Sequence, residues 1–134
     1  MITILEGADW NPRWEFPIEG EVFIDLRGID KKHRIVRKIG RVLRAEDSPL
    51  INGNSLDALI DVVSDWFIET WGTDRVIYIA GGKTLEYQGV KFALEVTLSI
   101  EDAFMQAIYD RALNYDGTGI SEEFARVSVY LCMN

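Results

Sequence analysis

The chain has 134 residues, a length that suits one domain with its own core and leaves little room for two. Its 14 Lys and Arg residues are outnumbered by 22 Asp and Glu residues, which gives a formal net charge of −8 at pH 7. Such a surface repels phosphate backbones overall, so a general nucleic-acid-binding protein is disfavoured. The 48% of hydrophobic residues argues against an intrinsically disordered chain.

Two features bear on the compartment. The single cysteine, Cys132, has no partner within the chain, and unpaired thiols are usual in reducing compartments. No basic segment precedes an apolar stretch after Met1, and the apolar run over residues 76–80 is far shorter than the roughly 20 residues that cross a bilayer. We therefore expect a soluble, cytoplasmic protein that does not contact membranes.

The first elements are predicted from aromatic, alternating and helical patterns in turn. Residues 8–20 contain Trp10, Trp14 and two of the three prolines, which predicts an irregular segment anchored on the domain by aromatic side chains. Alternation over residues 21–28 predicts a strand. A helix that Asp30 caps follows to about Arg44, and its outer face has seven of the chain's 14 basic residues and no acid. A solvated face is the commoner explanation for such a helix, and contact with phosphate is the alternative.

The rest of the chain alternates helices and strands. A second helix is predicted over residues 56–69, capped by Asn54 or Ser55. The nearly continuous apolar run over residues 75–80 predicts a strand covered on both faces, which favours a parallel sheet. Residues 83–97 could form a hairpin around Gln88-Gly89, and Ser99 could cap a third helix to about residue 113, with Phe104, Met105, Ile108 and Ala112 as its apolar side. A last strand over residues 125–132 completes a small α/β layered domain.

The second helix contains the most informative charge pattern. Four carboxylates recur every four residues and so lie on one helix face: Asp57, Asp61, Asp65 and Glu69. Like charges at this spacing destabilise a helix by about 0.2–0.5 kcal/mol per pair. A solvated acidic face is the commoner explanation, and an anionic ridge that docks into a cationic pocket on a partner is the sharper one.

Signals for catalysis and for metal binding are weaker. Carboxylates one turn apart can share a cation, but the only histidine, His33, lies in another helix, and no calcium-binding loop motif is present. The common nucleophile, zinc-protease and phosphate-loop motifs are missing as well. We expect a protein that is not an enzyme and needs no metal or cofactor. A carboxylate-based metalloenzyme stays open as a third hypothesis.

The loop and start of the second helix carry a family signature. Its sequence, Gly53-Asn54-Ser55-Leu56-Asp57-Ala58-Leu59-Ile60-Asp61, resembles the Gly-Glu-Asn-Leu-Asp-Ala-Leu-Trp-Asp motif of the barstar-like family of intracellular ribonuclease inhibitors. Trp66 falls where that family has a tryptophan, and the order of predicted elements is similar. The resemblance implies one domain over residues 1–134, with three layers and a small parallel sheet of about three strands flanked by helices. Residues 1–20 would be an N-terminal extension and residues 83–97 an insertion.

The same resemblance implies a function. Barstar-like proteins block the active site of a basic nuclease toxin, and their two motif aspartates, here Asp57 and Asp61, lie against its phosphate-binding residues. The further partner-binding positions that it implies are Ile51, Asn52, Gly53, Asn54, Ile60, Ser64, Asp65 and Asp110. We therefore expect a monomeric immunity protein that forms a 1:1 complex with a nuclease toxin, first of all a ribonuclease, and does not itself bind nucleic acid.

Departures from the family pattern point to a toxin of another kind. The family has aromatic residues where this chain has Ile51, Asn52 and Ile60, and aromatic side chains are frequent interface anchors. The alternative is an interaction module that kept the fold without inhibiting a nuclease and binds through the basic helix or the Trp-rich N-terminus.

Overall fold

One four-stranded sheet organises the protein. The structure, a computed structural model, describes residues 2–43, 55–70, 73–114 and 126–134, without the side chains of residues 111–114. The strands are β1 (Ile2–Glu6), β2 (Glu21–Asp25), β3 (Arg75–Ala80) and β4 (Val127–Cys132), and their order in the sheet is β1-β4-β3-β2. Every neighbouring pair is parallel. The predicted α/β class and parallel sheet are confirmed, with four strands in place of about three.

The additional strand lies in the predicted N-terminal extension. Residues 1–20 are therefore not outside the sheet, because β1 forms one of its edges and pairs along its length with β4, Ile4 opposite Val129. Its β-branched residues Ile2, Thr3 and Ile4 favour a strand, but a run of five residues is short, and the pairing with β4 fixes its place in the sheet.

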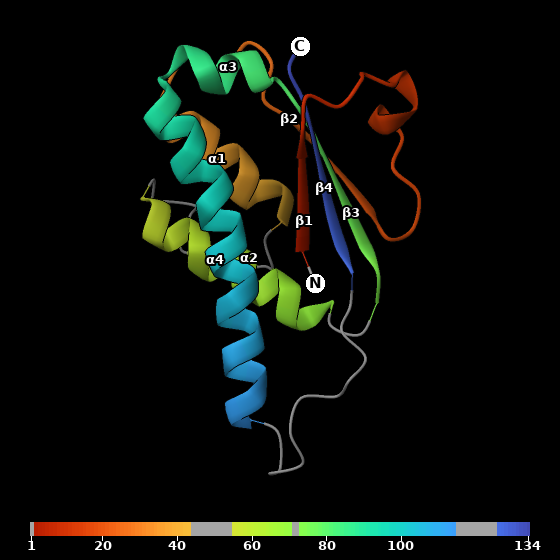
Figure 1. Ribbon diagram of the computed structural model, residues 1–134, viewed down its shortest axis with the longest axis vertical. Coiled ribbons are helices and arrows are strands. Elements are labelled where there is room, and N and C mark those ends of the chain that lie inside the picture. Colours follow the sequence, from red (N-terminus) through yellow and green to blue (C-terminus); the bar gives the residue numbers. More distant parts are fainter. Residues whose placement is uncertain (1, 44–54, 71–72, 115–125) are drawn as a thin grey trace.

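Helices cover one face of this sheet. They are α1 (Lys32–Leu43), α2 (Leu56–Glu69), the short α3 (Gly82–Tyr87) and the long α4 (Val90–Asn114), and α1, α2 and α4 lie on the same side of the strands (Figure 1). The core fills the space between, with fully buried Ile24, Ile39, Leu59 and Ile77 among its members. The boundaries predicted for the second helix are confirmed, and Ser55 is its N-cap, since its hydroxyl accepts a hydrogen bond from the N–H of Ala58 at 3.1 Å.

The opposite face is covered by the N-terminal segment. A short 3-10 helix, η1 (Pro12–Glu15), places Trp14 on this face, where its indole stacks on Tyr78 with ring centroids 4.5 Å apart. Trp10 packs against Trp14 and against Phe23 of β2. The predicted aromatic anchoring of residues 8–20 is thus present, and β3 is covered on both faces. The third layer consists of this segment with its short 3-10 helix, however, and not of α-helices (Figure 1).

An ion pair ties the segment to the sheet. Arg13 donates to both carboxylate oxygens of Glu21 at 2.9 and 3.0 Å, and the Tyr78 hydroxyl donates to the same carboxylate at 3.0 Å. Hydrogen bonding by the Arg13 guanidinium holds the pKa of Glu21 at about 2, well below its usual value of 4.5. These charges therefore have a structural use within the fold.

The predicted hairpin over residues 83–97 is wrong. Helix α3 ends at Tyr87, and α4 begins at Val90, so Gln88-Gly89 joins two helices instead of two strands. Gly89 supplies this turn with a φ of +115°, which side chains rarely tolerate. Ser99 is no helix cap: it is 5% exposed inside α4, and its hydroxyl donates to the carbonyl of Glu95, one turn earlier, at 2.6 Å.

Gly81 makes the turn that ends β3. Its φ is +97°, and a Cβ added there would lie 2.7 Å from backbone atoms of Leu26 and Arg27, so the chain after β3 passes too close to the chain after β2 for any side chain. Gly81 thus ends β3 and is the N-cap of α3, and Gly82 is the first residue of that helix. Among the described residues, no helix is long and apolar enough to cross a membrane.

Candidate partner-binding site

The four carboxylates of α2 form an exposed row, called the acidic ridge here: Asp57, Asp61, Asp65 and Glu69. The opposite side of α2 is buried through Leu59, Val63 and Phe67, which fixes the orientation of the ridge towards solvent. Within the described residues, none of the four carboxylates forms an ion pair. The ridge is thus an uncompensated negative surface on a rigid element.

Its arrangement works against the stability of α2. Asp57 lies in the first turn, where the positive end of the helix dipole favours it, but Glu69 is the last helical residue, where the dipole opposes a negative charge. The last turn of α2 contains no basic residue that would relieve it. Neighbouring ridge carboxylates also repel one another along the helix. Charges that lower the stability of their own helix are typical of residues that serve an external contact.

Helix α4 lies against α2 beside the ridge. Gln106 donates from Nε2 to Oδ1 of Asp61 at 3.3 Å, and Phe67 packs edge-on against Phe104 with ring centroids 5.3 Å apart. Asp102 and Asp110 are one helical turn before and after Gln106, which brings them to the same side of α4. These two acids thus extend the negative surface from α2 onto α4, and Asp110 is the later-helix acid that the sequence predicted.

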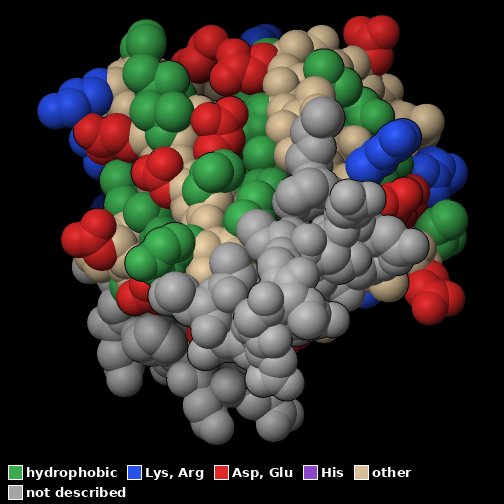
Figure 2. All heavy atoms as spheres, turned by 60° about the horizontal axis from the view of Figure 1, so that its bottom comes forward, with side chains coloured by type: hydrophobic (Ala, Val, Ile, Leu, Met, Phe, Trp, Pro, Cys, Tyr) green, Lys and Arg blue, Asp and Glu red, His purple; other side chains and the backbone are tan. Residues whose placement is uncertain are grey.

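Apolar side chains accompany these acids. On α4, Met105 is 60% exposed and Tyr109 is 64% exposed. The two residues lie one helical turn apart: Met105 directly precedes Gln106 in the sequence, and Tyr109 follows it by three residues. Figure 2 shows acidic and hydrophobic side chains interspersed on the end of the molecule where α2 and the second half of α4 lie. We refer to the acidic ridge with Asp102, Met105, Tyr109 and Asp110 as the α2–α4 face.

The structure separates the predicted site residues into three groups. Ile51, Asn52, Gly53 and Asn54 lie outside the described residues. Asp57, Asp61 and Asp65 are exposed on the ridge, with Ile60 half-buried beside them. These exposed residues and Asp110 come together on the α2–α4 face.

Ser64 belongs to the third group, because it is 1% exposed and cannot contact a partner. It lies three residues before Phe67 on the side of α2 that packs on α4, and its hydroxyl has no hydrogen-bond partner within the described residues. Its prediction as a binding residue is wrong. The family resemblance implies a binding role at this position, whereas helical periodicity from the core residues Val63 and Phe67 places Ser64 on the buried side of α2.

Met105 and Tyr109 were missed as surface residues because the third helix was predicted to begin too late. The true start at Val90 places Phe92, Val96, Ile100, Phe104 and Ala107 in the core. With that register, Met105 turns outwards although its neighbour Phe104 is 3% exposed. The full length of α4 was the signal that could have identified them.

Comparisons with models of protein families, with curated proteins and with solved structures found no match to this chain. Among the described residues, no group of three or more His, Cys, Asp or Glu side chains is arranged to hold a metal ion. The site is therefore interpreted from its own geometry, as an acidic and partly apolar surface built by two packed helices.

Proposed function

We propose that this protein is an inhibitor of a basic nuclease, first of all a ribonuclease toxin, and that it blocks the nuclease active site with the α2–α4 face. The observation that carries the proposal is the acidic ridge, four exposed carboxylates with no ion-pair partner within the described residues. A nuclease active site binds phosphates through basic residues, and carboxylates at regular spacing can occupy the same positions. The protein itself acts by binding and catalyses no reaction.

The order of elements supports this proposal. The barstar-like resemblance rests on a strand, two helices, an apolar strand, a later helix and a final strand, and β2, α1, α2, β3, α4 and β4 follow in that order. The motif aspartates Asp57 and Asp61 lie at the exposed start of α2. A matching order is compatible with other functions, so the charge pattern bears the argument.

Exposed apolar residues of α4 can serve as interface anchors where this chain lacks the aromatic residues of the barstar-like family. Interfaces draw most of their binding energy from a few large side chains surrounded by polar contacts. Met105 and Tyr109 are more than half exposed and lie beside Gln106, which contacts the ridge through Asp61. They provide anchors on α4. In the barstar-like family, aromatic residues provide them at the positions that Ile51, Asn52 and Ile60 occupy in this chain. The partner consequently differs in shape from the nucleases that typical family members bind.

The test is inhibition of the nuclease encoded next to the gene for this protein, measured as hydrolysis of a fluorescent RNA oligonucleotide. We expect stoichiometric inhibition and a 1:1 complex by size-exclusion chromatography. Replacing Asp57 and Asp61 together by Asn should weaken the complex by about 30-fold or more, because the loss of even one interface hot spot costs about 2 kcal/mol or more. Rising salt should slow association, since complementary charge accelerates encounter.

The matched control is Glu19→Gln with Glu86→Gln, which removes the same charge from exposed positions outside the α2–α4 face. This variant should inhibit as the unchanged protein does. Equal loss of inhibition in both double variants would mean that net charge and not the ridge governs binding. A neighbouring nuclease that forms no complex and keeps its full activity would contradict the proposal.

A second candidate function, an interaction module without inhibitory activity, is favoured by another surface of α4. Val90, Leu94 and Leu98 are 78%, 55% and 44% exposed and lie one turn apart, towards the start of the helix. Trp14 is buried against the sheet and is not free to bind a partner, so the row of Val90, Leu94 and Leu98 takes the place of the Trp-rich segment in this alternative. A partner that is lost with Leu94→Ser and Leu98→Ser but retained without Asp57 and Asp61 would identify this function.

A further inference from the structure

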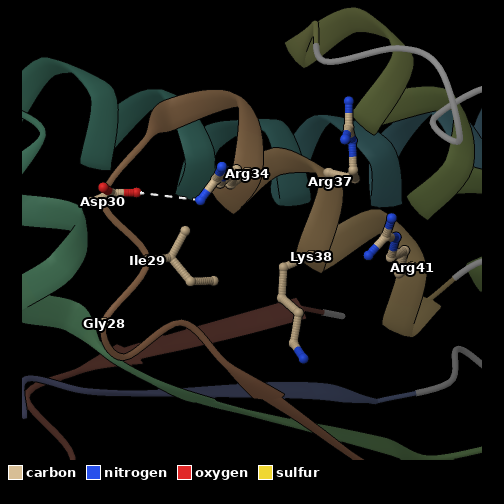
Figure 3. Close-up of a pocket in the computed structure, with 7 residues that line it drawn as sticks. All are labelled: Gly28, Ile29, Asp30, Arg34, Arg37, Lys38 and Arg41. Atoms are coloured by element: carbon tan, nitrogen blue, oxygen red, sulfur yellow. Dashed lines mark ion pairs between the residues drawn. The ribbon is translucent and has the colours of Figure 1, made fainter.

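A cationic pocket lies on the outer side of α1. Its volume is about 340 Å³, and it is bounded by the Gly28–Asp30 segment, which leads from β2 into α1, and by four basic side chains of α1: Arg34, Arg37, Lys38 and Arg41. Figure 3 shows Arg34 reaching towards Asp30 at one end of this stretch of α1 and Arg41 at the other, with Arg37 and Lys38 between them and extending to opposite sides. The pocket shares no residue with the α2–α4 face.

The fold maintains this pocket at a fixed place. Gly28 has a φ of +78°, which lets the chain turn sharply after β2 and return to the start of α1. The other side of α1 is held by the fully buried Ile35 and Ile39. The basic side chains therefore extend from a rigid helix, and their spacing is set by its turns.

Most of the positive charge in the pocket has no ion-pair partner among the described residues, although Lys38 lies near enough to Asp25 to help lower the pKa of that carboxyl. The lining has four cationic side chains against one carboxylate, Asp30, which lies 3.7 Å from Arg34 in a pair whose side chains are 71% and 60% exposed. Such an exposed pair is weak and is easily exchanged for a stronger anion. Within the described residues, Arg37, Lys38 and Arg41 form no ion pair, and the buried Nε of Arg37 has no acceptor.

We propose that this pocket binds the diphosphate or triphosphate group of a small molecule. Arginine recognises phosphate oxygens with paired N–H donors, and a pocket of this volume lies at the lower end of the roughly 300–1,000 Å³ of small-molecule sites. Arg34 and Arg41 are two helical turns apart, about 10 Å along the axis. That distance exceeds the reach of a single phosphate and suits two or three phosphates linked in a row.

The lining also favours a small polyphosphate over RNA. Proteins that bind single-stranded nucleic acids place aromatic side chains where the bases stack. Among the described residues that line this pocket none is aromatic, and Ile29 is the one with an apolar side chain. The ligand is thus recognised by its phosphates alone, and a free polyphosphate and a nucleotide are the two sources of the same group.

The experiment is calorimetric titration of the full-length protein at low salt with sodium tripolyphosphate, ATP and orthophosphate. We expect tripolyphosphate to bind, and orthophosphate to bind at least about tenfold more weakly, because fewer charge-assisted hydrogen bonds form. ATP equal to tripolyphosphate would mean that the pocket accepts the group from either source. ATP much weaker would mean that free polyphosphate is the ligand. Amide resonances of residues 28–41 should shift in the NMR spectrum on binding.

Single substitutions locate the site. Arg34→Gln and Arg41→Gln should each weaken tripolyphosphate binding by about tenfold, and Asp30→Asn should strengthen it by removing the competing carboxylate. Lys38→Gln serves as a second reduction of charge if an arginine variant does not fold. The control Lys83→Gln removes an exposed cation of α3, outside the pocket, and should change the affinity by less than about twofold.

Three results would overturn the proposal. The first is that tripolyphosphate gives neither heat nor resonance shifts. The second is that Lys83→Gln loses as much affinity as Arg34→Gln and Arg41→Gln do. The third is that a short RNA binds more tightly than tripolyphosphate. Nuclease inhibition is a separate readout: the Asp57 and Asp61 double variant should bind tripolyphosphate normally, so the pocket and the proposed function can fail independently.

Discussion

Gln106 on α4 donates a hydrogen bond from Nε2 to Oδ1 of Asp61 on α2, at 3.3 Å. The contact joins the middle of the acidic ridge to the helix that presents Met105 and Tyr109. Its neighbours on the ridge, Asp57 and Asp65, are exposed. The two helices thereby present charged and apolar side chains on one surface. The effect of the ridge carboxylates on the free energy of unfolding can be measured without knowledge of the partner.

Neutralising the centre of the ridge should stabilise the free protein. Asp65 repels both Asp61 and Glu69 along α2, so Asp65→Asn removes two unfavourable pairs and should raise the free energy of unfolding by about 0.4–1 kcal/mol. Asp57→Asn should give no such gain, because it also removes a favourable charge from the first turn of α2. Urea unfolding followed by circular dichroism measures both variants. A loss of stability with Asp65→Asn would show that the ridge serves the fold itself.

Ser64 offers a test of burial within α2. Its hydroxyl is buried and has no partner within the described residues, and alanine favours helix more than serine does. Ser64→Ala should therefore raise the free energy of unfolding by about 0.5–1.5 kcal/mol and leave partner binding unchanged. Chemical denaturation and the inhibition assay examine the two statements separately. Weaker inhibition together with an unchanged stability would return Ser64 to the binding surface.

The N-terminal segment should contribute strongly to stability through Trp14. The indole is 8% exposed and stacks on Tyr78, so Trp14→Ala should cost about 3–5 kcal/mol and lower the near-ultraviolet dichroism. Phe16→Ala is the matched control: Phe16 is in the same segment but 74% exposed, and its loss should change stability by less than about 0.5 kcal/mol. Similar losses in the two variants would indicate that the segment is not anchored through Trp14.

Stability should fall in acid partly through Glu21. Because the folded-state pKa of about 2 lies below the usual 4.5, the ionised carboxylate favours the folded protein. Its contribution is fully present above about pH 4.5 and is lost as the pH falls towards 2. Glu21→Gln should flatten the pH dependence of unfolding in this range, and NMR titration of the Glu21 carboxyl should give the low pKa directly.

The control for Glu21 is Glu19→Gln, an exposed carboxylate nearby that should leave the acid slope unchanged. Some slope will persist in Glu21→Gln, because hydrogen bonds from Arg27 also hold the pKa of Asp25 below its usual value. An unaltered slope in Glu21→Gln would show that the Arg13 pair does not form in solution.

Local signals predicted the elements that carry strong patterns. The apolar run of β3, the periodicity of α2 and the cap at Ser55 each follow from neighbouring residues, so the parallel sheet and the ridge were accessible from the sequence. The basic face of α1 was visible as well. Its shape as a pocket was not, because Gly28–Asp30 closes it only after the turn from β2 has formed.

Elements that depend on distant partners were harder to predict. Strand β1 is identified by its pairing with β4, at the far end of the chain. Gln88-Gly89 satisfies the requirements of a hairpin turn and of a helix–helix turn equally well, and only the 25-residue length of α4 decides between them. Ser99 resembles a cap in sequence, but its hydroxyl bonds within the helix. The exposure of Met105 and Tyr109 could be predicted only once the full extent of α4, from Val90, was known.

The position of β4 has a consequence for folding. The last strand of the chain lies inside the sheet, between β3 and β1, so β1 has no strand to pair with until β4 has joined β3. The ladder that connects residues 2–6 with 127–131 therefore forms late, because the edge of β4 that it needs becomes available only once β4 has paired with β3. Folding should begin with the β2, β3 and helix layer, and β1 should be among the last elements to be fixed.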